Sequence, residues 1–201
     1  MATIETIEAL EALYGAPGQP AVAKVTSRLT PSQRAWIERS RFCVLSTVGP
    51  EGTDGSPRGD DGPVVRVADD RTLLLPDWRG NNRIDSLRNI VRDGRVSLIF
   101  LIPGSNTAMR VNGSANLRTD PDLLAGFEKA GKLPRCVIAV RIAEVYPQCA
   151  RALMRAELWT AGDQAQGLPG IGDMLREASG GGIDGAAYDA AWPARAKTSM
   201  W

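Results

Sequence analysis

The stretch that decides the fold runs from Val64 to Ala115 and reads VVRVADDRTLLLPDWRGNNRIDSLRNIVRDGRVSLIFLIPGSNTAMRVNGSA. Two apolar runs, Val64–Val67 and Leu73–Leu75, flank a short ADDR turn, a pattern that predicts an antiparallel hairpin. A polar loop, a short amphipathic segment and two further strand-like runs follow. Because the first two strands are too close together for a crossover helix, the pattern favours an antiparallel barrel over a doubly wound sheet.

The sequence on both sides of this stretch adds further elements. The expected strands, six in all, lie at residues 42–48, 64–68, 71–76, 95–102, 107–118 and 135–146. Helices are expected at 2–14, 31–40, 120–130 and 148–158, with one more beginning near Asn82. The Gly- and Asp-rich segment 49–62 is expected to be a loop. We expect a single domain, 1–201, with a helical N-terminal extension (1–40) and a C-terminal tail (160–201).

Composition excludes several classes of protein. The chain has 201 residues, enough to bury a core, and its net charge of +1 gives no sign of a nucleic-acid or membrane surface. No apolar run reaches the roughly 18 residues of a membrane span, and the acidic N-terminus is unlike a secretory signal. Cys43, Cys136 and Cys149 are widely spaced, which favours reduced thiols over disulfides or a zinc site. A cytoplasmic protein is expected.

The absence of histidine from the sequence limits the chemistry. A Ser-His-Asp or Cys-His nucleophile system cannot form within one chain. The usual metal ligand is missing and the carboxylates are scattered, so no metal site is expected. No GxGxxG motif follows a strand and no Walker loop is present, which argues against a Rossmann domain. If the protein is an enzyme, a bound cofactor carries the chemistry.

The segment WRGNNRIDSLRNIVRD (78–93) is the candidate for binding an anion. Its apolar residues have helical spacing, and Asn81 or Asn82 can cap the helix start. The first N–H groups of such a helix are unpaired and favour an anion, to which Arg83 adds a charge and a forked donor suited to phosphate. On the residues alone, an ordinary cap among surface arginines is the commoner explanation of such a motif, and both interpretations stay open.

The order of elements from about Phe42 to Arg118, with RVSLIF at 95–100 and VNGSA at 111–115, resembles the pyridoxamine 5′-phosphate oxidase-like FMN-binding split barrels. The segments SPRGD (56–60), LLLPDWRGNNR (73–83) and CARALMRAELW (149–159) are most similar to a branch of FMN-dependent enzymes in that family. The resemblance covers roughly residues 35–160. It implies a mainly β (α+β) fold, a six-stranded antiparallel split β-barrel with peripheral helices. It also implies that FMN binds at a homodimer interface.

The resemblance also implies roles for individual residues. On this alignment Asn82 and Arg83 match the pair that binds the FMN phosphate, and Pro76 and Asp77 match the pair that follows the third strand and contacts the flavin. Arg66 falls near a basic position that faces the flavin and substrate.

Three more residues are candidates for cofactor binding. Arg110 and Asn112 share one face of their strand and face either solvent or the ligand, since their neighbours Met109 and Val111 are expected in the core. Arg58 either reaches the flavin edge or belongs to an ordinary turn. No catalytic residue is identified.

Two classes of function remain open. The first is an FMN-dependent oxidoreductase acting on a small molecule, with a reduced nicotinamide (NADH or NADPH) or a small substrate as hydride donor. The second is a non-catalytic flavin-, haem- or deazaflavin-binding protein or carrier, because a fold does not determine a function. The tail WPARAKTSMW (192–201) lacks the histidine that the vitamin-B6 oxidases place there, so pyridoxamine phosphate oxidation itself is not expected.

Overall fold

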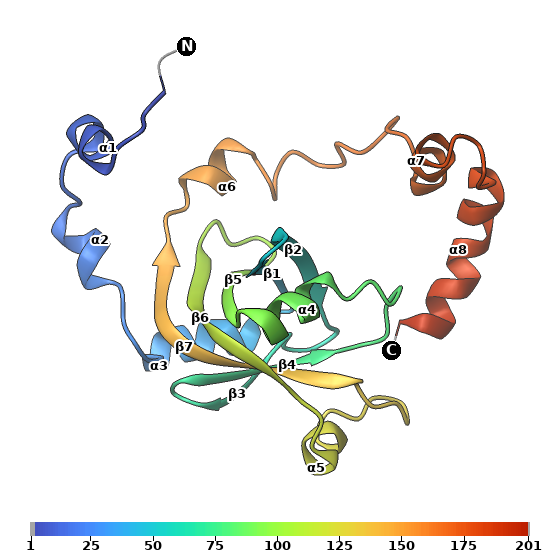
Figure 1. The fold of residues 1–201 in the computed structure, drawn as a ribbon, viewed down its shortest axis with the longest axis horizontal. Coiled ribbons are helices and arrows are strands. Elements are labelled where there is room, and N and C mark those ends of the chain that lie inside the picture. The colour runs from blue at the N-terminus through green and yellow to red at the C-terminus, as the bar shows by residue number, and fades with distance from the viewer. Residues whose placement is uncertain (1–2, 201) are drawn as a thin grey trace.

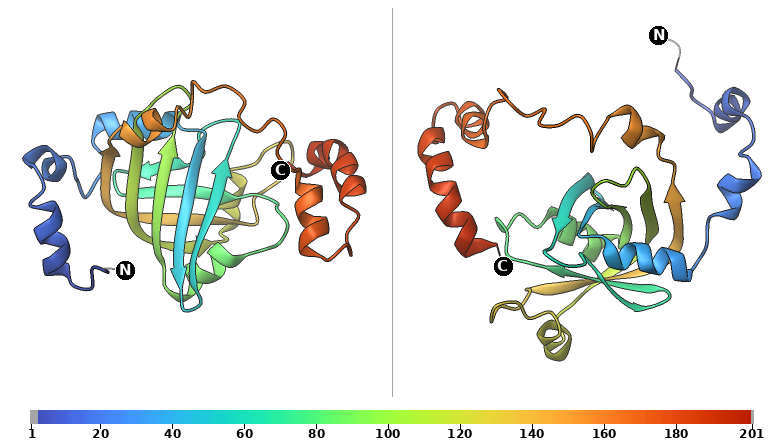
Figure 2. Two further views of the ribbon diagram at one scale, coloured as in Figure 1. Left: turned by 90° about the horizontal axis from the view of Figure 1, so that it is seen from above. Right: turned by 180° about the vertical axis from the view of Figure 1, so that it is seen from behind.

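A curled antiparallel sheet of seven strands forms the centre of the protein (Figure 1). In this computed structural model, residues 3–200 are described. The strand order is β2-β1-β5-β6-β7-β4-β3. The strands are β1 (Phe42–Gly49), β2 (Gly52–Gly59), β3 (Arg66–Asp69), β4 (Thr72–Asp77), β5 (Arg95–Leu101), β6 (Ala108–Arg118) and β7 (Cys136–Gln148). The sheet wraps around a single core but remains open, because β2 and β3 are its edges and do not pair with each other (Figure 2).

The prediction of six strands is wrong by one, because β2 lies inside the segment that was expected to be a loop. Its residues, GTDGSPRG, have low strand propensity of their own. The strand forms because it pairs with β1 along its whole length, from Gly49 opposite Gly52 to Phe42 opposite Gly59. Pro57 is tolerated because β2 is an edge strand, which has one side free of partner strands.

The core fills the concave side of the sheet. Alternate residues of β1 and β5 are buried, including Leu45, Leu98 and Phe100, as expected for strands with one face inside. In β6, Met109 and Val111 are buried and Arg110 is half-buried on the opposite face, which is the alternation predicted from the sequence.

Eight helices surround or extend this sheet within the described residues. They are α1 (Ile7–Tyr14), α2 (Gln19–Ala23), α3 (Pro31–Arg39), α4 (Asp85–Arg92), α5 (Pro121–Ala125), α6 (Arg151–Arg155), α7 (Ile171–Ala178) and α8 (Gly185–Ser199). Helix α3 starts where predicted, with Thr30 and Gln33 forming a capping box and Pro31 as first residue. The helix expected at 148–158 shortens to α6, because β7 continues to Gln148 by pairing with β6.

The two ends of the chain extend away from the barrel on opposite sides (Figures 1 and 2). Residues 3–23, which contain α1 and α2, are all exposed. The tail, expected to have weak periodicity, contains α7 and α8, which pack on each other where Gly172 and Gly185 let the two backbones approach closely. Within residues 3–200, no helix combines the length and apolar character needed to cross a bilayer.

Candidate functional site

A cleft of about 870 Å³ lies at the opening of the barrel. Strand β2 forms one wall, the end of β4 and the loop 78–84 form another, and the start of α4 closes one end. This volume falls in the range of about 300–1,000 Å³ that is usual for small-molecule and cofactor sites. Five residues predicted from the sequence line it: Arg58, Pro76, Asp77, Asn82 and Arg83.

An ion pair crosses the opening of the barrel inside this cleft. Arg58 on β2 donates from Nη1 to Oδ1 of Asp77 on β4 over 2.5 Å, and the two side chains are only 19% and 13% exposed. Arg58 points inward because it lies opposite the buried Cys43 in the β1–β2 pair. Its Nε is buried and has no hydrogen-bond partner among the described residues.

The unpartnered Nε of Arg58 indicates that an acceptor is missing at this position. A buried donor without an acceptor costs roughly 1–3 kcal/mol, so such groups are rare in folded proteins. Arg58, held by Asp77, therefore lines a cofactor-sized cleft with a guanidinium whose donors are not all satisfied within the protein.

The start of α4 differs from the sequence prediction. The helix begins at Asp85 with Ile84 as its N-cap, and no side chain caps it. Asn81 instead accepts a hydrogen bond from the backbone N–H of Arg83 at 3.0 Å, which makes a local turn, and Asn82 takes a left-handed conformation with φ of 63°. Asparagine side chains favour such turns and tolerate this backbone region, so the helix starts later than the pattern predicts.

The predicted phosphate pair lies at this turn. Oδ1 of Asn82 accepts from Nη1 of Arg135 at 2.9 Å, which brings a second arginine to the same end of the cleft. Arg83 is 80% exposed and donates from Nε to Oδ2 of Asp85 over 2.6 Å. This hydrogen bond and the charge of Asp85 raise the pKa of Arg83. Arg83 is therefore at the cleft, but its charge is shared with a neighbouring carboxylate and screened by solvent.

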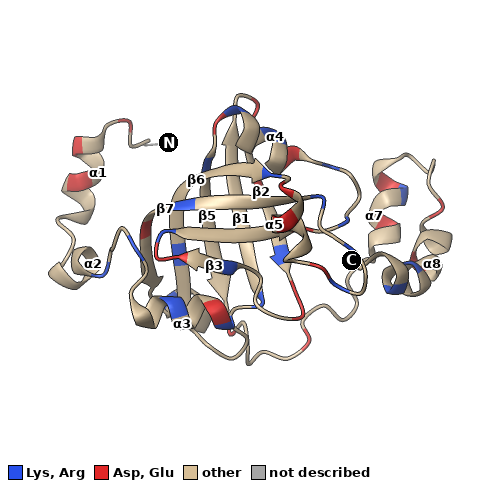
Figure 3. Cartoon of the chain, turned by 90° about the horizontal axis from the view of Figure 1, so that it is seen from below, with Lys and Arg blue, Asp and Glu red and all other residues tan. Residues whose placement is uncertain are grey.

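Charge is divided unevenly along the cleft. Its arginines are Arg58, Arg79, Arg83 and Arg135, and its aspartates are Asp54, Asp60, Asp61, Asp77 and Asp85. Three of the four arginines lie in the loop 78–84 or contact it, so this end is the basic one. Over the face shown in Figure 3, Lys and Arg are interspersed with Asp and Glu.

Three of the residues predicted to bind the cofactor do not line the cleft of their own chain. Arg66 on β3 places its guanidinium 4.1 Å from the centre of the Phe127 ring and lines a second, smaller hollow. Arg110 and Asn112 lie on the convex face of β6 and line neither hollow. Asn112 accepts from the hydroxyl of Ser97 at 2.9 Å, and the Nε of Arg110 is buried without a partner in the described residues.

The structure adds residues that the sequence did not indicate. Trp78 and Arg135 line the cleft, and so does Cys136, which opposes Asp77 in the β4–β7 pair. Burial, with the nearby charge of Asp77, raises the pKa of the Cys136 thiol to about 11, so it stays protonated at neutral pH. Arg135 and Cys136 lie more than fifty positions after Asp77, and only the strand pairing shows that they are neighbours.

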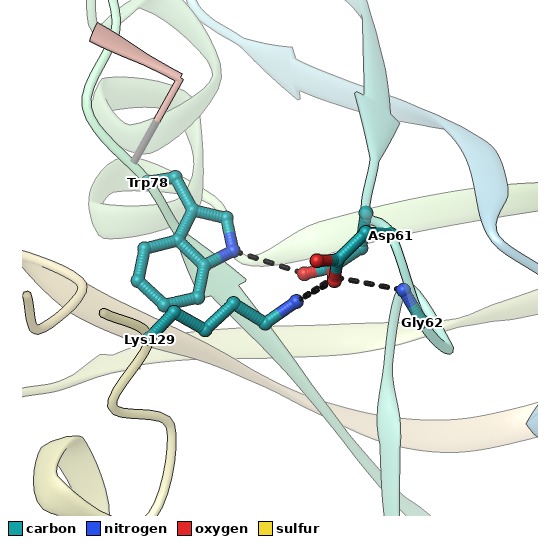
Figure 4. Close-up of polar contacts among 5 residues, drawn as sticks. Asp61, Gly62, Trp78 and Lys129 are labelled. Carbon is teal, nitrogen blue, oxygen red and sulfur yellow. Dashed lines mark hydrogen bonds and ion pairs between the residues drawn. The ribbon is translucent and has the colours of Figure 1, made fainter. Parts of the chain in front are cut away.

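A polar cluster stands beside the cleft (Figure 4). Asp60, whose side chain is 4% exposed, accepts from the indole Nε1 of Trp78 at 3.1 Å and from the backbone N–H of Gly62 at 3.1 Å. The ammonium of Lys129 bonds both Asp60 and Asp61. Among residues 3–200, no group of three or more His, Cys, Asp or Glu side chains is placed to hold a metal ion.

Comparison with known proteins identifies the class of this barrel. A family model described as Pyridoxamine 5′-phosphate oxidase matches residues 29–149, more than half of the chain. The chain therefore belongs to the pyridoxamine 5′-phosphate oxidase family, as the resemblance of its sequence predicts. Among curated proteins, none is significantly similar to it.

Several solved structures are similar to this chain in fold. They include a tagged form of HupZ from Group A Streptococcus, with 17% identity over 59% of this chain and 93% of that one and a TM-score of 0.48. An FMN-binding protein from Syntrophomonas wolfei shares 12% identity over 71% and 97% of the two chains, with a TM-score of 0.44. The FAD binding protein from Mycobacterium smegmatis shares 15% identity over 61% and 97%, with a TM-score of 0.42.

Proposed function

We propose that this protein binds FMN in the main cleft and acts as an FMN-dependent oxidoreductase on a small molecule. The observation that carries the proposal is the buried, unpartnered Nε of Arg58 in a cleft of about 870 Å³, in a chain of the pyridoxamine 5′-phosphate oxidase family. A ring system with acceptor atoms along one edge, as the flavin has, satisfies this donor without disturbing the ion pair with Asp77.

The residues of the cleft fit the other parts of the cofactor. The basic end, with Arg79, Arg83 and Arg135, suits the phosphate. Pro76 and Leu75 supply apolar wall, and Asp77 holds Arg58 in place. When bound, FMN supplies the hydride acceptor that the side chains themselves lack.

The chain's own residues then bind, orient and shield the reacting centre. The sequence contains no histidine, and the Cys136 thiol, with a pKa of about 11, carries its proton at neutral pH. The positive charge of Arg58 lies where it can stabilise negative charge that develops on a bound ring. As hydride donor we propose a reduced nicotinamide, NADH or NADPH, or the small-molecule substrate.

We further propose that the protein works as a homodimer. Arg110 and Asn112 lie on the convex face of the sheet, so they reach a flavin only if it belongs to a second copy. The buried, unpartnered Nε of Arg110 supports this, because a second copy packed on that face can supply the acceptor. The three cysteines are free, which supports a reducing compartment such as the cytoplasm.

One variant tests the role of the Arg58 Nε in FMN binding. Arg58→Lys keeps a cation for Asp77 but has no Nε donor, so FMN affinity should fall by about tenfold while the fold is retained. Flavin fluorescence titration measures the affinity, and the absorption spectrum after adding NADH or NADPH measures turnover. Unchanged FMN affinity in the variant would refute the site. Tight FMN binding without any reduction would favour the non-catalytic carrier instead.

A further inference from the structure

A second hollow of about 540 Å³ lies next to the main cleft. Its walls come from the end of α3, strand β3 and the segment 126–129 that follows α5. Asp60, Pro76 and Trp78 line both hollows. Because the indole of Trp78 borders each of them, it forms a partition with one ligand-sized space on either side.

The partition is held in a defined position. Nε1 of Trp78 donates to Oδ2 of Asp60 at 3.1 Å, and the Asp60 side chain is almost fully buried. The ammonium of Lys129 bonds Asp60 and lies 5.9 Å from the centre of the Trp78 ring. Figure 4 shows Lys129 beside the indole of Trp78. Residues from two other parts of the chain therefore fix the indole, so it makes a preorganised wall.

The rest of the smaller hollow suits a flat apolar ring. Phe127 contributes a second aromatic wall, and Pro63 and Val65 contribute aliphatic surface. Phe127 belongs only to this hollow and does not line the main cleft. Two aromatic side chains on one small cavity favour a planar aromatic ligand, because ring-on-ring contacts add to the burial of apolar area.

Charge around the hollow disfavours an anion. Three carboxylates, Glu38, Asp60 and Glu128, line it together with Arg66 and Lys129. Lys129 already bonds two aspartates, and the Arg66 guanidinium packs on Phe127 and donates to the carbonyl of Gly126 at 3.3 Å. Of these carboxylates Glu38 pairs with Arg34 and Asp60 with Lys129, so the exposed Glu128 sets the charge preference. An incoming anion meets its carboxylate, whereas both lining cations already have partners.

We propose that the smaller hollow is a second binding site, specific for a planar aromatic ring that is neutral or positively charged, such as a nicotinamide-type ring. The ligand binds across the Trp78 partition from the main cleft and does not compete with its occupant. The site rests on the geometry of the hollow and not on the proposed function.

The test uses three probes of the same shape and different charge: the N-methylnicotinamide cation, neutral nicotinamide and the nicotinate anion. Each is titrated into ¹⁵N-labelled full-length protein while the indole N–H signal of Trp78, assigned by its loss in Trp78→Phe, is followed. We expect saturable shifts with the cation and the neutral probe, and about fivefold weaker binding of nicotinate. Equal binding of all three probes would overturn the charge specificity.

Two variants separate the hollows. Phe127→Ala removes a wall of the smaller one alone, so probe binding should weaken by about tenfold while FMN binding is unchanged. Arg83→Ala alters only the main cleft and should leave probe binding intact. Repeating the titration with saturating FMN should give the same probe affinity.

Displacement of the probe by FMN, or wild-type probe affinity in Phe127→Ala, would overturn the second site. If FMN does not bind at all, the proposed function fails, but the titrations without FMN still decide this proposal. Glu128→Gln, at an exposed position, provides a further check: it should reduce the preference for the cation over nicotinate.

Discussion

The ion pair between Arg58 and Asp77 allows a prediction whose size follows from its burial. Asp77→Asn keeps the shape of the side chain and one oxygen acceptor but removes the negative charge that faces Arg58. Leaving one partner of a fully buried pair uncompensated costs about 3–5 kcal/mol. Here the two side chains retain 19% and 13% exposure and one hydrogen bond can persist, so we expect a loss of about 2 kcal/mol in the free energy of unfolding.

A matched control lies in the same cleft. Asp85→Asn removes the same charge from a second arginine pair, with Arg83, but those side chains are 46% and 80% exposed. Solvent screens this pair, and Asp85 otherwise contributes only its charge in the first turn of α4, so its loss should lower the unfolding free energy by less than about 1 kcal/mol. Urea unfolding of both variants and wild type, without flavin, gives the comparison. Equal stability of the two variants would show that the opening of the barrel is not held by a desolvated ion pair.

Further predictions concern the cofactor, the thiols and the dimer. Arg83→Ala should weaken the binding of FMN more than that of riboflavin, which has no phosphate. Asp85→Asn frees Arg83 and should therefore strengthen the binding of FMN but not of riboflavin. Fluorescence titration with both flavins measures each affinity. Burial raises the pKa of the Cys136 thiol from 9.0 to about 11. The contribution of the protonated thiol to the free energy of unfolding is therefore full below pH 9 and should be lost as the pH rises toward 11, which urea unfolding measures. Iodoacetamide should label exposed Cys149 first, as mass spectrometry can show. If the protein forms the proposed dimer, Arg110→Glu should convert it into monomers in light scattering; a wild-type monomer that binds FMN tightly would contradict the proposed dimer.

Local chemistry explains the elements that were predicted well. Helix α3 begins at Pro31 because Thr30 and Gln33 cap it, an interaction complete within four residues. The hairpin of β3 and β4 and the alternation in β6 follow from short apolar patterns. Five of the predicted site residues line one cleft. They were predicted from the order of strands and helices that the family shares, which is recognisable in the sequence from about Phe42 to Arg118.

Two features were missed because the local sequence alone does not decide them. Strand β2 has a turn-like composition and exists because β1 supplies its hydrogen bonds. The turn made by Asn81 competes with the helix start and moves it to Asp85, a choice between two local bonds that composition does not decide. In both segments two local conformations, strand or loop and helix or turn, have nearly equal free energy. Small contributions therefore determine which one forms.

The sequence by itself determined the class of fold, the family and the absence of histidine-based chemistry, because these follow from local patterns and composition. Only the tertiary structure decided which side chains meet at the site. Arg58 reaches Asp77 across the barrel opening, and Lys129 reaches Asp60 from a loop that follows α5. Such contacts join segments that are separated in the chain, and they form only because burying the common core brings β2, the end of β4 and the loop after α5 together.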